Sequence, residues 1–299
     1  MSRILVTGSR GLIGSALAHS LTASGYEVVE FDVSLQPEPK DVTDPSALAE
    51  AINGCSGVVH LGAVSRVLWG EQDPVRCRQV NVGGTKNVLE ISSQAATQPW
   101  VLVASSREVY GQPDTLPVAE SANRAPLNEY GHTKLDAERL VESAAQAGLR
   151  ASVIRFSNVY GSVDDHSDRV VPAFARQAAA GAVLRIDGPD ATFDFTHIED
   201  VTRALQTAVD LLATSDISLP ALHLVSGRAT TLAELAAMAI AAAGQGSTEV
   251  QPYRDYDVKQ FVGDPTLAAQ VLQWRTAITI EDGMSDLVRR FSKVSRPPG

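Results

Sequence analysis

The chain has 299 residues, 44% of them hydrophobic, and a formal net charge of −10 at pH 7. This length allows one large α/β domain, or two small ones, with a sizeable core. The negative charge argues against a surface for polyanions, so nucleic acid is not an expected partner.

Short apolar runs alternate with longer Ala- and Leu-rich stretches in the first part of the chain. This alternation predicts βαβ units and a parallel sheet. The strand runs are almost continuously hydrophobic, as expected when helices cover both faces of a sheet. We expect strands at 3–7, 26–31, 57–61, 99–104 and 150–156, and helices at 12–24, 45–52, 75–97 and 130–147.

Beyond residue 160 the alternation becomes less regular. A helix opened by Thr231, with Glu234 three residues later, has a capping-box arrangement. The expected elements are helices at 168–180, 198–212 and 231–243 and strands at 182–187 and 221–225, the last returning to the main sheet.

The predicted fold is therefore α/β, a Rossmann-type doubly wound parallel sheet with a smaller interleaved C-terminal lobe. Residues 1–160 would form the main domain, joined by a segment at about 196–227. Residues 161–299 would form mainly the smaller lobe.

Cys55 and Cys77 are the two cysteines, and no histidine or cysteine stands near them at metal-ligand spacing. We therefore expect neither a metal site nor a disulfide framework. The N-terminus runs directly into a strand-like segment, and the sequence has no long apolar span. These features predict a cytoplasmic protein that does not engage a membrane.

A Gly-rich turn joins the first predicted strand to the first helix, where Gly8, Gly11 and Gly14 are spaced as Gly-x-x-Gly-x-x-Gly around Leu12 and Ile13. Glycines here let the backbone turn tightly and approach a pyrophosphate, which the free amides of the helix N-terminus attract. Such a turn is a weak indicator alone, because glycines also simply end strands.

Asp32 closes the second predicted strand. A carboxylate at this position would accept hydrogen bonds from an adenosine ribose and would repel a 2′-phosphate. The pattern therefore favours NAD over NADP, although an aspartate that merely ends a strand is the competing interpretation.

Tyr130 and Lys134 are four residues apart in a predicted helix, which places the ammonium near the phenol. Tyrosine titrates near pH ~10, and a close cation together with an oxidised nicotinamide would bring its pKa toward that of a working base. Ser106 follows the apolar run Val101 to Ala104 and should emerge at the carboxyl edge of the sheet. Its hydroxyl could bond the substrate oxygen that Tyr130 deprotonates. The pattern predicts proton abstraction from an alcohol.

Together these motifs resemble the NAD-dependent epimerase/dehydratase family of extended short-chain dehydrogenases/reductases, which includes nucleotide-sugar epimerases. The resemblance rests on motifs that arrive in the family's order and rough spacing. They are Thr7-Gly-x-x-Gly-x-x-Gly, Asp41-Val42, His60-Leu61-Gly62-Ala63, Asn81-Val82-Gly83-Gly84-Thr85, Ser105-Ser106-Arg107-Glu108-Val109-Tyr110-Gly111, Tyr130-x-x-x-Lys134 and Arg155-Phe156-Ser157-Asn158-Val159-Tyr160-Gly161.

The resemblance implies roles for individual residues. Asp41 and Val42 would lie by the adenine, the Leu61–Gly62–Ala63 segment would flank the nicotinamide half, and Asn81 would support the cofactor site. Ser106 would be the third catalytic residue beside Tyr130 and Lys134. The full set expected to bind NAD is Gly8, Gly11, Leu12, Ile13, Gly14, Asp32, Asp41, Val42, Leu61, Gly62, Ala63, Asn81, Tyr130, Lys134 and Ser157, with Asn158 at the seam toward the substrate.

One departure from the family pattern follows the catalytic serine. Dehydratases of the family carry Asp-Glu there, whereas this chain has Arg107-Glu108, which weakens the case for eliminating water. Glu108 remains as an acid or base for decarboxylation or another step after oxidation. A solvated or structural glutamate is an equal alternative.

A second departure concerns the substrate's phosphates. The family's Arg-Asp-Phe near residue 200 is Phe193-Asp194-Phe195 here, so one expected phosphate-binding arginine is absent. Arg254 lies in a segment that resembles the family's Arg-Pro-Gly-Asp-Val, and a guanidinium suits a diphosphate. Arg185 is a second candidate, with an exposed strand arginine as the simpler interpretation.

The resemblance and the residues together predict an NAD-dependent nucleotide-sugar epimerase, acting at C4 of a hexose on a nucleoside diphosphate through a transient 4-keto sugar. Alternatives are a 4-ketoreductase or sugar dehydrogenase, and a decarboxylase or dehydratase using Glu108. A non-catalytic dinucleotide-sensing protein would not need the complete set of Ser106, Tyr130 and Lys134. Helices like those expected at 75–97 and 130–147 commonly pair across a two-fold axis in this family, which predicts a homodimer.

Overall fold

The computed structural model describes residues 2–252 and 258–294. Its main sheet has six strands, and every neighbouring pair is parallel. The strands are β1 Arg3–Thr7, β2 Glu27–Phe31, β3 Gly57–His60, β4 Trp100–Ser106, β5 Ala151–Phe156 and β10 Leu222–Leu224, in the spatial order β2-β1-β3-β4-β5-β10. The strand order reverses beside β1, so the carboxyl ends of β1 and β3 form the topological switch point where such sheets bind ligands.

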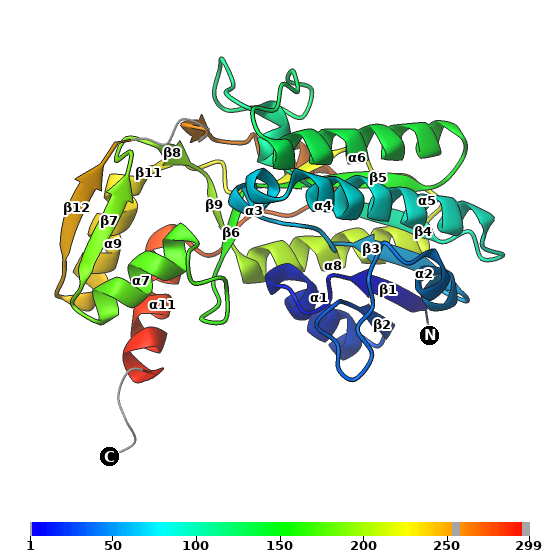
Figure 1. Cartoon of the computed structure of the whole chain (residues 1–299), viewed down its shortest axis with the longest axis horizontal. Helices are drawn as coiled ribbons and strands as arrows, with labels where there is room; N and C mark the ends of the chain where they lie inside the picture. The colour runs from blue at the N-terminus through cyan, green and yellow to red at the C-terminus, as the bar shows by residue number, and fades with distance from the viewer. Residues whose placement is uncertain (1, 253–257, 295–299) are drawn as a thin grey trace.

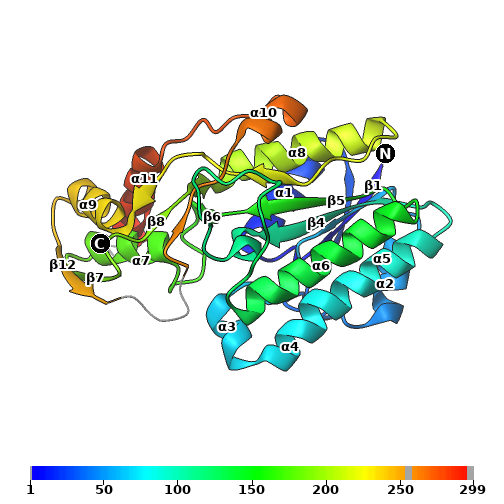
Figure 2. The same cartoon turned by 90° about the horizontal axis from the view of Figure 1, so that it is seen from above.

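Helices cover both faces of this sheet (Figure 1 and Figure 2). On one face lie α1 Leu12–Ala23 and α8 Ile198–Thr214, and on the other α2 Pro45–Ile52, α5 Gly84–Gln94 and α6 Glu129–Gln146. Successive strand residues point to opposite faces, so Ile4 packs into the first layer and Leu5 into the second. The predicted doubly wound α/β sheet is confirmed, and double burial explains its continuous apolar runs.

The smaller lobe is built around three helices that pack on one another, α7 Val170–Ala179, α9 Leu232–Ala243 and α11 Ile280–Val294 (Figure 1). Beside them β7 Val183–Asp187 pairs in parallel with β12 Ser247–Gln251. The predicted capping box is confirmed, because the Thr231 hydroxyl accepts from the Glu234 amide at 3.1 Å and Glu234 accepts from the Thr231 amide at 2.8 Å. The lobe is interleaved with the sheet, since α8 and β10 return to it, whereas the division near residue 160 stays a prediction.

Short strands that the sequence did not predict join the lobe to the sheet. β6 Asn158–Tyr160 pairs with β9 Phe195–His197, and β8 Thr192–Phe193 lies between β11 Thr230–Thr231 and β13 Gln260–Phe261. Asp194, between β8 and β9, is fully buried, and its carboxylate accepts from the amides of Ser226 at 2.8 Å and Gly227 at 2.7 Å. Such strands are too short to show a period of two in the sequence.

The helix expected at 75–97 differs from the structure. It is divided into α4 Pro74–Arg78, a π-helical turn Gln79–Gly83, and α5. Pi-helical turns recur at functional sites, and this one carries the buried Asn81. Two short helices, α3 Val67–Gln72 and α10 Thr266–Leu272, were not predicted.

Candidate functional site

A cavity of about 950 Å³ lies at the carboxyl ends of β1, β3, β4 and β5 and continues to α7, β7 and β8 of the lobe. Of the predicted site residues, Asn81 does not line it, and Arg254 lies outside the described residues. The predicted residues that do line it are Gly8, Gly11, Leu12, Ile13, Gly14, Asp32, Asp41, Val42, Leu61, Gly62, Ala63, Ser106, Glu108, Tyr130, Lys134, Ser157, Asn158 and Arg185.

The Gly-rich turn is closely packed against the loop after β3. Gly8 has φ +69°, in the left-handed region, and a Cβ there would lie 2.7 Å from the Gly62 nitrogen. Gly11 is the N-cap of α1, and no side chain caps this helix. The missing side chain lets the turn pack against this loop, and the start of α1, which no side chain caps, forms a cradle suited to a pyrophosphate.

A buried hydrogen-bond chain fixes the Gly62 loop. The Thr7 hydroxyl accepts from the Gly62 amide at 3.1 Å and lies 2.7 Å from His60 Nδ1. His60 Nε2 lies 3.2 Å from the Thr85 hydroxyl, which itself donates to the Asn81 carbonyl at 2.6 Å. His60 must therefore donate from Nε2 and accept at Nδ1, and burial and the charge of Lys134 lower its pKa to about 3, so the ring is neutral.

Asn81 contacts the cavity wall indirectly, by hydrogen bonds to the Val64 backbone. Its Oδ1 accepts from the Val64 amide at 2.8 Å, and its Nδ2 donates to the Val64 carbonyl at 3.1 Å and to the Thr133 hydroxyl at 2.9 Å. Val64 lines the cavity, whereas Asn81 does not. A supporting role for Asn81 at a cofactor site stays a prediction.

Asp32 is held at the end of β2. Its carboxylate accepts from the Arg10 amide at 3.0 Å and from the Ser34 amide at 2.8 Å. Arg10 was not predicted, although it stands inside the Gly-rich motif; its guanidinium pairs with Glu30 at 3.1 Å. Both Asp32 and Arg10 line the cavity, so a carboxylate and a cation meet at this end of the site.

Asp41 also has protein partners. Its carboxylate accepts from the Thr43 amide at 2.9 Å and pairs with Arg76 at 2.6 Å. Burial acts to raise the pKa of Asp41, but these hydrogen bonds and the Arg76 charge outweigh it, so the pKa lies below its ordinary value. Arg76, on α4, was not predicted because only the side-chain pairing brings it to the cavity.

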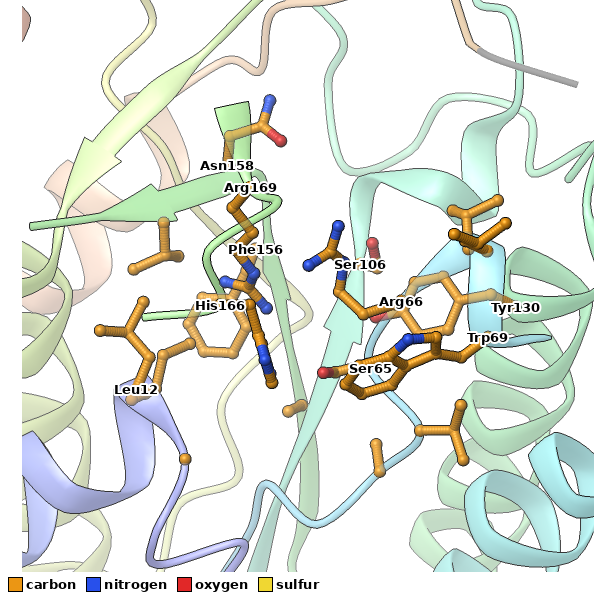
Figure 3. A pocket seen from close by; sticks show the side chains of 18 of the residues that line it. Leu12, Ser65, Arg66, Trp69, Ser106, Tyr130, Phe156, Asn158, His166 and Arg169 are labelled. Carbon is orange, nitrogen blue, oxygen red and sulfur yellow. The ribbon is translucent and has the colours of Figure 1, made fainter. Parts of the chain in front are cut away.

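The three predicted catalytic side chains line the same cavity as the Gly-rich turn. Ser106 ends β4, and α6 begins after the N-cap Asn128, whose side chain accepts from the Gly131 amide at 2.8 Å. Tyr130 and Lys134 follow in the first turns of α6, and all three groups are buried. Figure 3 shows Ser106 and Tyr130 on one wall, with Leu12, Phe156 and His166 on the opposite wall.

Burial is the largest cause of the pKa shifts of Tyr130 and Lys134. It raises the pKa of Tyr130 to about 12, together with the Glu108 charge, while the Ser106 hydrogen bond and the Arg169 charge act in the opposite direction. Burial also lowers the pKa of Lys134 to about 8. The Lys134 ammonium lies 5.8 Å from the Tyr130 ring centroid and donates to the Ala104 carbonyl at 3.0 Å. The phenol is therefore protonated at neutral pH, so the helical spacing alone does not produce a base.

Glu108 is buried, with 6% of its surface exposed, so the solvated alternative is wrong. Its carboxylate accepts from Asn128 Nδ2 at 2.8 Å and pairs with Arg107 at 3.0 Å. These partners fix the carboxylate beside Ser106 and leave a structural role or an acid/base role for it.

The remaining predicted residues lie on or beside β5, β6 and β7. The Ser157 hydroxyl donates to the Asp194 carbonyl at 2.8 Å. Asn158 Nδ2 is buried and has no hydrogen-bond partner among the described residues. Arg185 is a rim residue, because its side chain is 65% exposed and donates to Asp187 at 2.8 Å.

Contacts that the sequence did not predict bridge the two walls. Arg66 pairs with Asp168 at 2.6 Å, and the rings of Trp69 and His166 meet edge to face with centroids 5.0 Å apart. Figure 3 shows Arg66 and Trp69 facing His166 and Arg169 across the cavity. The position of Arg66 and Trp69 shortly after the His60-Leu61-Gly62-Ala63 motif was the only signal for them in the sequence.

Comparisons with known proteins agree with this geometry. The sequence model of the NAD dependent epimerase/dehydratase family matches residues 4–217. The UDP-glucose 4-epimerase of Rhizobium meliloti (strain 1021) is 29% identical over 306 residues, which cover 91% of this chain and 92% of the relative.

Solved structures match over nearly the whole chain. MoeE5 in complex with UDP-glucuronic acid and NAD is 30% identical, with a TM-score of 0.88, over 97% of this chain and 99% of that one. The UDP-glucose 4-epimerase of Thermotoga maritima, solved with UDP-glucose, is 26% identical, with a TM-score of 0.89, over 98% of this chain and 100% of that one. This chain therefore belongs to the NAD-dependent epimerase/dehydratase family.

Proposed function

We propose that this chain is an NAD-dependent nucleotide-sugar epimerase that acts at C4 of a hexose carried on a nucleoside diphosphate, through a transient 4-keto sugar. The observation that carries the proposal is that Ser106, Tyr130 and Lys134 line the same cavity as the Gly-rich turn. Alignment with UDP-glucose 4-epimerases over almost the whole chain supports the same activity.

The Gly-rich end fits NAD, because Gly8 leaves no room for a Cβ and α1 has no side-chain cap. We assign the pyrophosphate to the turn from Gly8 to Gly14, the adenosine ribose to Asp32, and the adenine to Asp41 and Val42. The segment 61–63 would flank the nicotinamide half, and residues 161–299 would mainly bind the substrate. NAD bound there supplies the redox chemistry for oxidising an alcohol and reducing the ketone.

The chain's own side chains move the proton and hold the sugar. The Tyr130 oxygen takes the proton from the C4 hydroxyl and returns it when the ketone is reduced. Ser106 bonds to the same substrate oxygen, and the buried ammonium of Lys134 stabilises the phenolate. All three groups are buried, which limits the access of bulk water to the reacting atoms.

Glu108 is held by Arg107 and Asn128 in this arrangement, which disfavours decarboxylation or elimination of water through it. The test is proton NMR of UDP-sugars with the purified protein and no added cofactor. We expect interconversion of C4 epimers and NAD released on denaturation. Turnover that consumes added NADH in proportion to product would instead indicate a 4-ketoreductase.

Asp32→Ala is expected to narrow the preference for NAD over NADP by about tenfold or more, because it removes a carboxylate that repels a 2′-phosphate. Dissociation constants for both dinucleotides would be measured by calorimetry. Glu27→Ala, at the other end of β2, is the matched control and should leave the ratio unchanged. An unmodified protein that binds NADP more tightly would refute the assignment of Asp32.

We also infer that the protein is a cytoplasmic homodimer. Helices α5 and α6 run side by side on one face of the sheet (Figure 2) and can form a four-helix contact with a second copy. Cys55 and Cys77 are both free and buried, which is compatible with a reducing compartment. In the part of the chain that the structure describes, no helix has the length and apolar character needed to cross a membrane.

Sedimentation velocity at micromolar concentration is expected to give twice the chain mass of 31.7 kDa. Asp136, on α6, pairs at 2.8 Å with Arg78, on the neighbouring α4. Asp136→Arg should yield monomers, since it places like charges on the proposed contact. Glu249→Arg, on the exposed strand β12, should leave the dimer intact. A monomeric unmodified protein would rule out this assembly.

A further inference from the structure

The two positions at which the sequence departs from its family lie against each other. Arg107 Cζ is 4.5 Å from the centroid of the Phe193 ring, and both residues line the cavity. The arginine expected on β8 is absent, but a guanidinium reaches its ring from the opposite wall, from the residue directly after Ser106. The two departures together therefore move a positive charge within the cavity, from position 193 on β8 to position 107 after β4.

The Arg107 guanidinium is held in place by two neighbours, Phe193 and Glu108. It stacks on Phe193, an interaction that orients a cation over a ring. It pairs with Glu108 at 3.0 Å, and Glu108 accepts from Asn128 at 2.8 Å. Only 13% of the Arg107 side chain and 8% of that of Glu108 are exposed. A guanidinium fixed in this way binds a ligand with little further loss of side-chain freedom.

Part of the hydrogen-bonding capacity of Arg107 is unused. Its Nη1 atom is shielded from solvent and makes no hydrogen bond among the described residues. Buried donors are nearly always paired, so an unpaired one at a cavity wall calls for an explanation. A carboxylate accepts two parallel N–H bonds from a guanidinium, and it would complete the pairing once the side chain turns Nη1 toward the cavity.

The cavity as a whole is suited to an anionic ligand. Its lining contains eight lysine or arginine residues and five aspartate or glutamate residues, although the chain has a net charge of −10. Arg169, whose charge acts on Tyr130, also lines the cavity and offsets the negative charge of Glu108. This surplus of cations suits the phosphates of the proposed ligands, and Arg107 and Arg169 extend it to the neighbourhood of Ser106 and Tyr130.

We propose that Arg107 binds a carboxylate at C6 of the sugar, so that the substrate is a nucleoside-diphosphate hexuronic acid. This rests on the proposed function, which places the C4 hydroxyl at Ser106 and Tyr130. Consecutive Cα atoms are about 3.8 Å apart, so Arg107 starts beside C4. C5, which carries C6, adjoins C4, whereas the diphosphate leaves from C1 across the ring. Arg107 is thus placed for the C6 group.

The test compares UDP-glucuronic acid, UDP-glucose and UDP as ligands of the NAD-bound protein by calorimetry. The unmodified protein should bind UDP-glucuronic acid about tenfold or more tightly than UDP-glucose. Arg107→Gln should weaken the binding of UDP-glucuronic acid about a hundredfold. The affinities for UDP-glucose and UDP should stay within about threefold of those of the unmodified protein. Arg107→Lys keeps the positive charge but loses the paired N–H donors of the guanidinium. Its affinity for UDP-glucuronic acid should lie between those of the unmodified protein and Arg107→Gln. Arg289→Gln, an exposed arginine on α11, is the control.

If Arg107→Gln weakened the binding of all three ligands equally, the guanidinium would be assigned to the diphosphate and the proposal would be overturned. An unmodified protein with no preference for UDP-glucuronic acid would also overturn it. If that protein still interconverts C4 epimers of a neutral UDP-hexose, the proposed function stands and only the carboxylate assignment fails. If Arg107→Gln does not fold, as judged by circular dichroism and NAD content, the Arg107→Lys comparison decides between the outcomes.

Discussion

Replacing Tyr130 with phenylalanine is expected to lower turnover of a nucleotide sugar by ~100-fold or more while NAD remains bound. The change removes a single oxygen atom, and the buried ring keeps its packing and its contact with the Lys134 ammonium. The lost oxygen is the one proposed to carry the proton between the C4 hydroxyl and the protein. The effect should therefore appear in kcat and not in the affinity for the cofactor.

Initial rates of C4 interconversion by proton NMR, with NAD content measured after denaturation, would check this result. Tyr26→Phe is the matched control, because the Tyr26 hydroxyl bonds to Asp210 at 2.6 Å and this tyrosine does not line the cavity. Burial and Asp210 raise the pKa of Tyr26 to about 12, so the two phenols differ in location more than in acidity. Near-normal turnover of the Tyr130 variant would remove Tyr130 from the mechanism.

The main sheet was predictable because its strands and helices carry strong local signals. Segments such as Ile4-Leu5-Val6 are apolar on both faces, and the predicted helix at 45–52 matches α2, which begins after the N-cap Asp44 with Pro45 in its first turn. The Gly-rich turn also carries a local signal, the spacing of its glycines. The residues that follow the strands were predictable from the geometry of parallel sheets. The carboxyl ends of parallel strands lie at one edge, so residues such as Asp32 and Ser106 gather there whatever their distance in sequence.

The features that the sequence did not reveal depend on contacts between distant segments. β6 and β9 are three residues each and exist because they pair with each other. The π-helical turn carries Asn81, whose side chain bonds to the Val64 backbone from a distant segment. The Arg107 contact with Phe193 joins two residues that each looked like a lost family position. Their relation emerges only when β4 and β8 face the same cavity.

The protonation states of Tyr130 and Lys134 also could not be predicted from the sequence. The helical spacing of Tyr130 and Lys134 correctly brings the ammonium over the ring, but it does not measure how deeply both groups are buried. Burial raises one pKa and lowers the other, and both shifts favour the neutral forms. A motif therefore identifies which groups meet, whereas the surrounding packing decides how they titrate.

Gly14→Ala and Gly83→Ala are expected to change folding stability in opposite directions. Both glycines adopt helical or near-helical backbone, where alanine is ordinarily more stable by about 0.5–1 kcal/mol. At Gly14, in the first turn of α1, a Cβ would lie 2.0 Å from the Gly8 carbonyl oxygen and 2.9 Å from Ser9 Cα. At Gly83, with φ −63°, no atom outside its own helix lies within 4 Å of a Cβ.

For Gly14 the clash outweighs helix propensity, because the atoms in the way belong to the backbone of the Gly-rich turn and cannot rotate aside. We expect the free energy of unfolding to fall by about 1–3 kcal/mol for Gly14→Ala and to rise by about 0.5–1 kcal/mol for Gly83→Ala. Urea denaturation of the NAD-free proteins would measure both values, and calorimetry should show weaker NAD binding for Gly14→Ala only. If Gly14→Ala were as stable as the unmodified protein, the turn would be free to move, and its close approach to the start of α1 could not be what shapes the cofactor cradle.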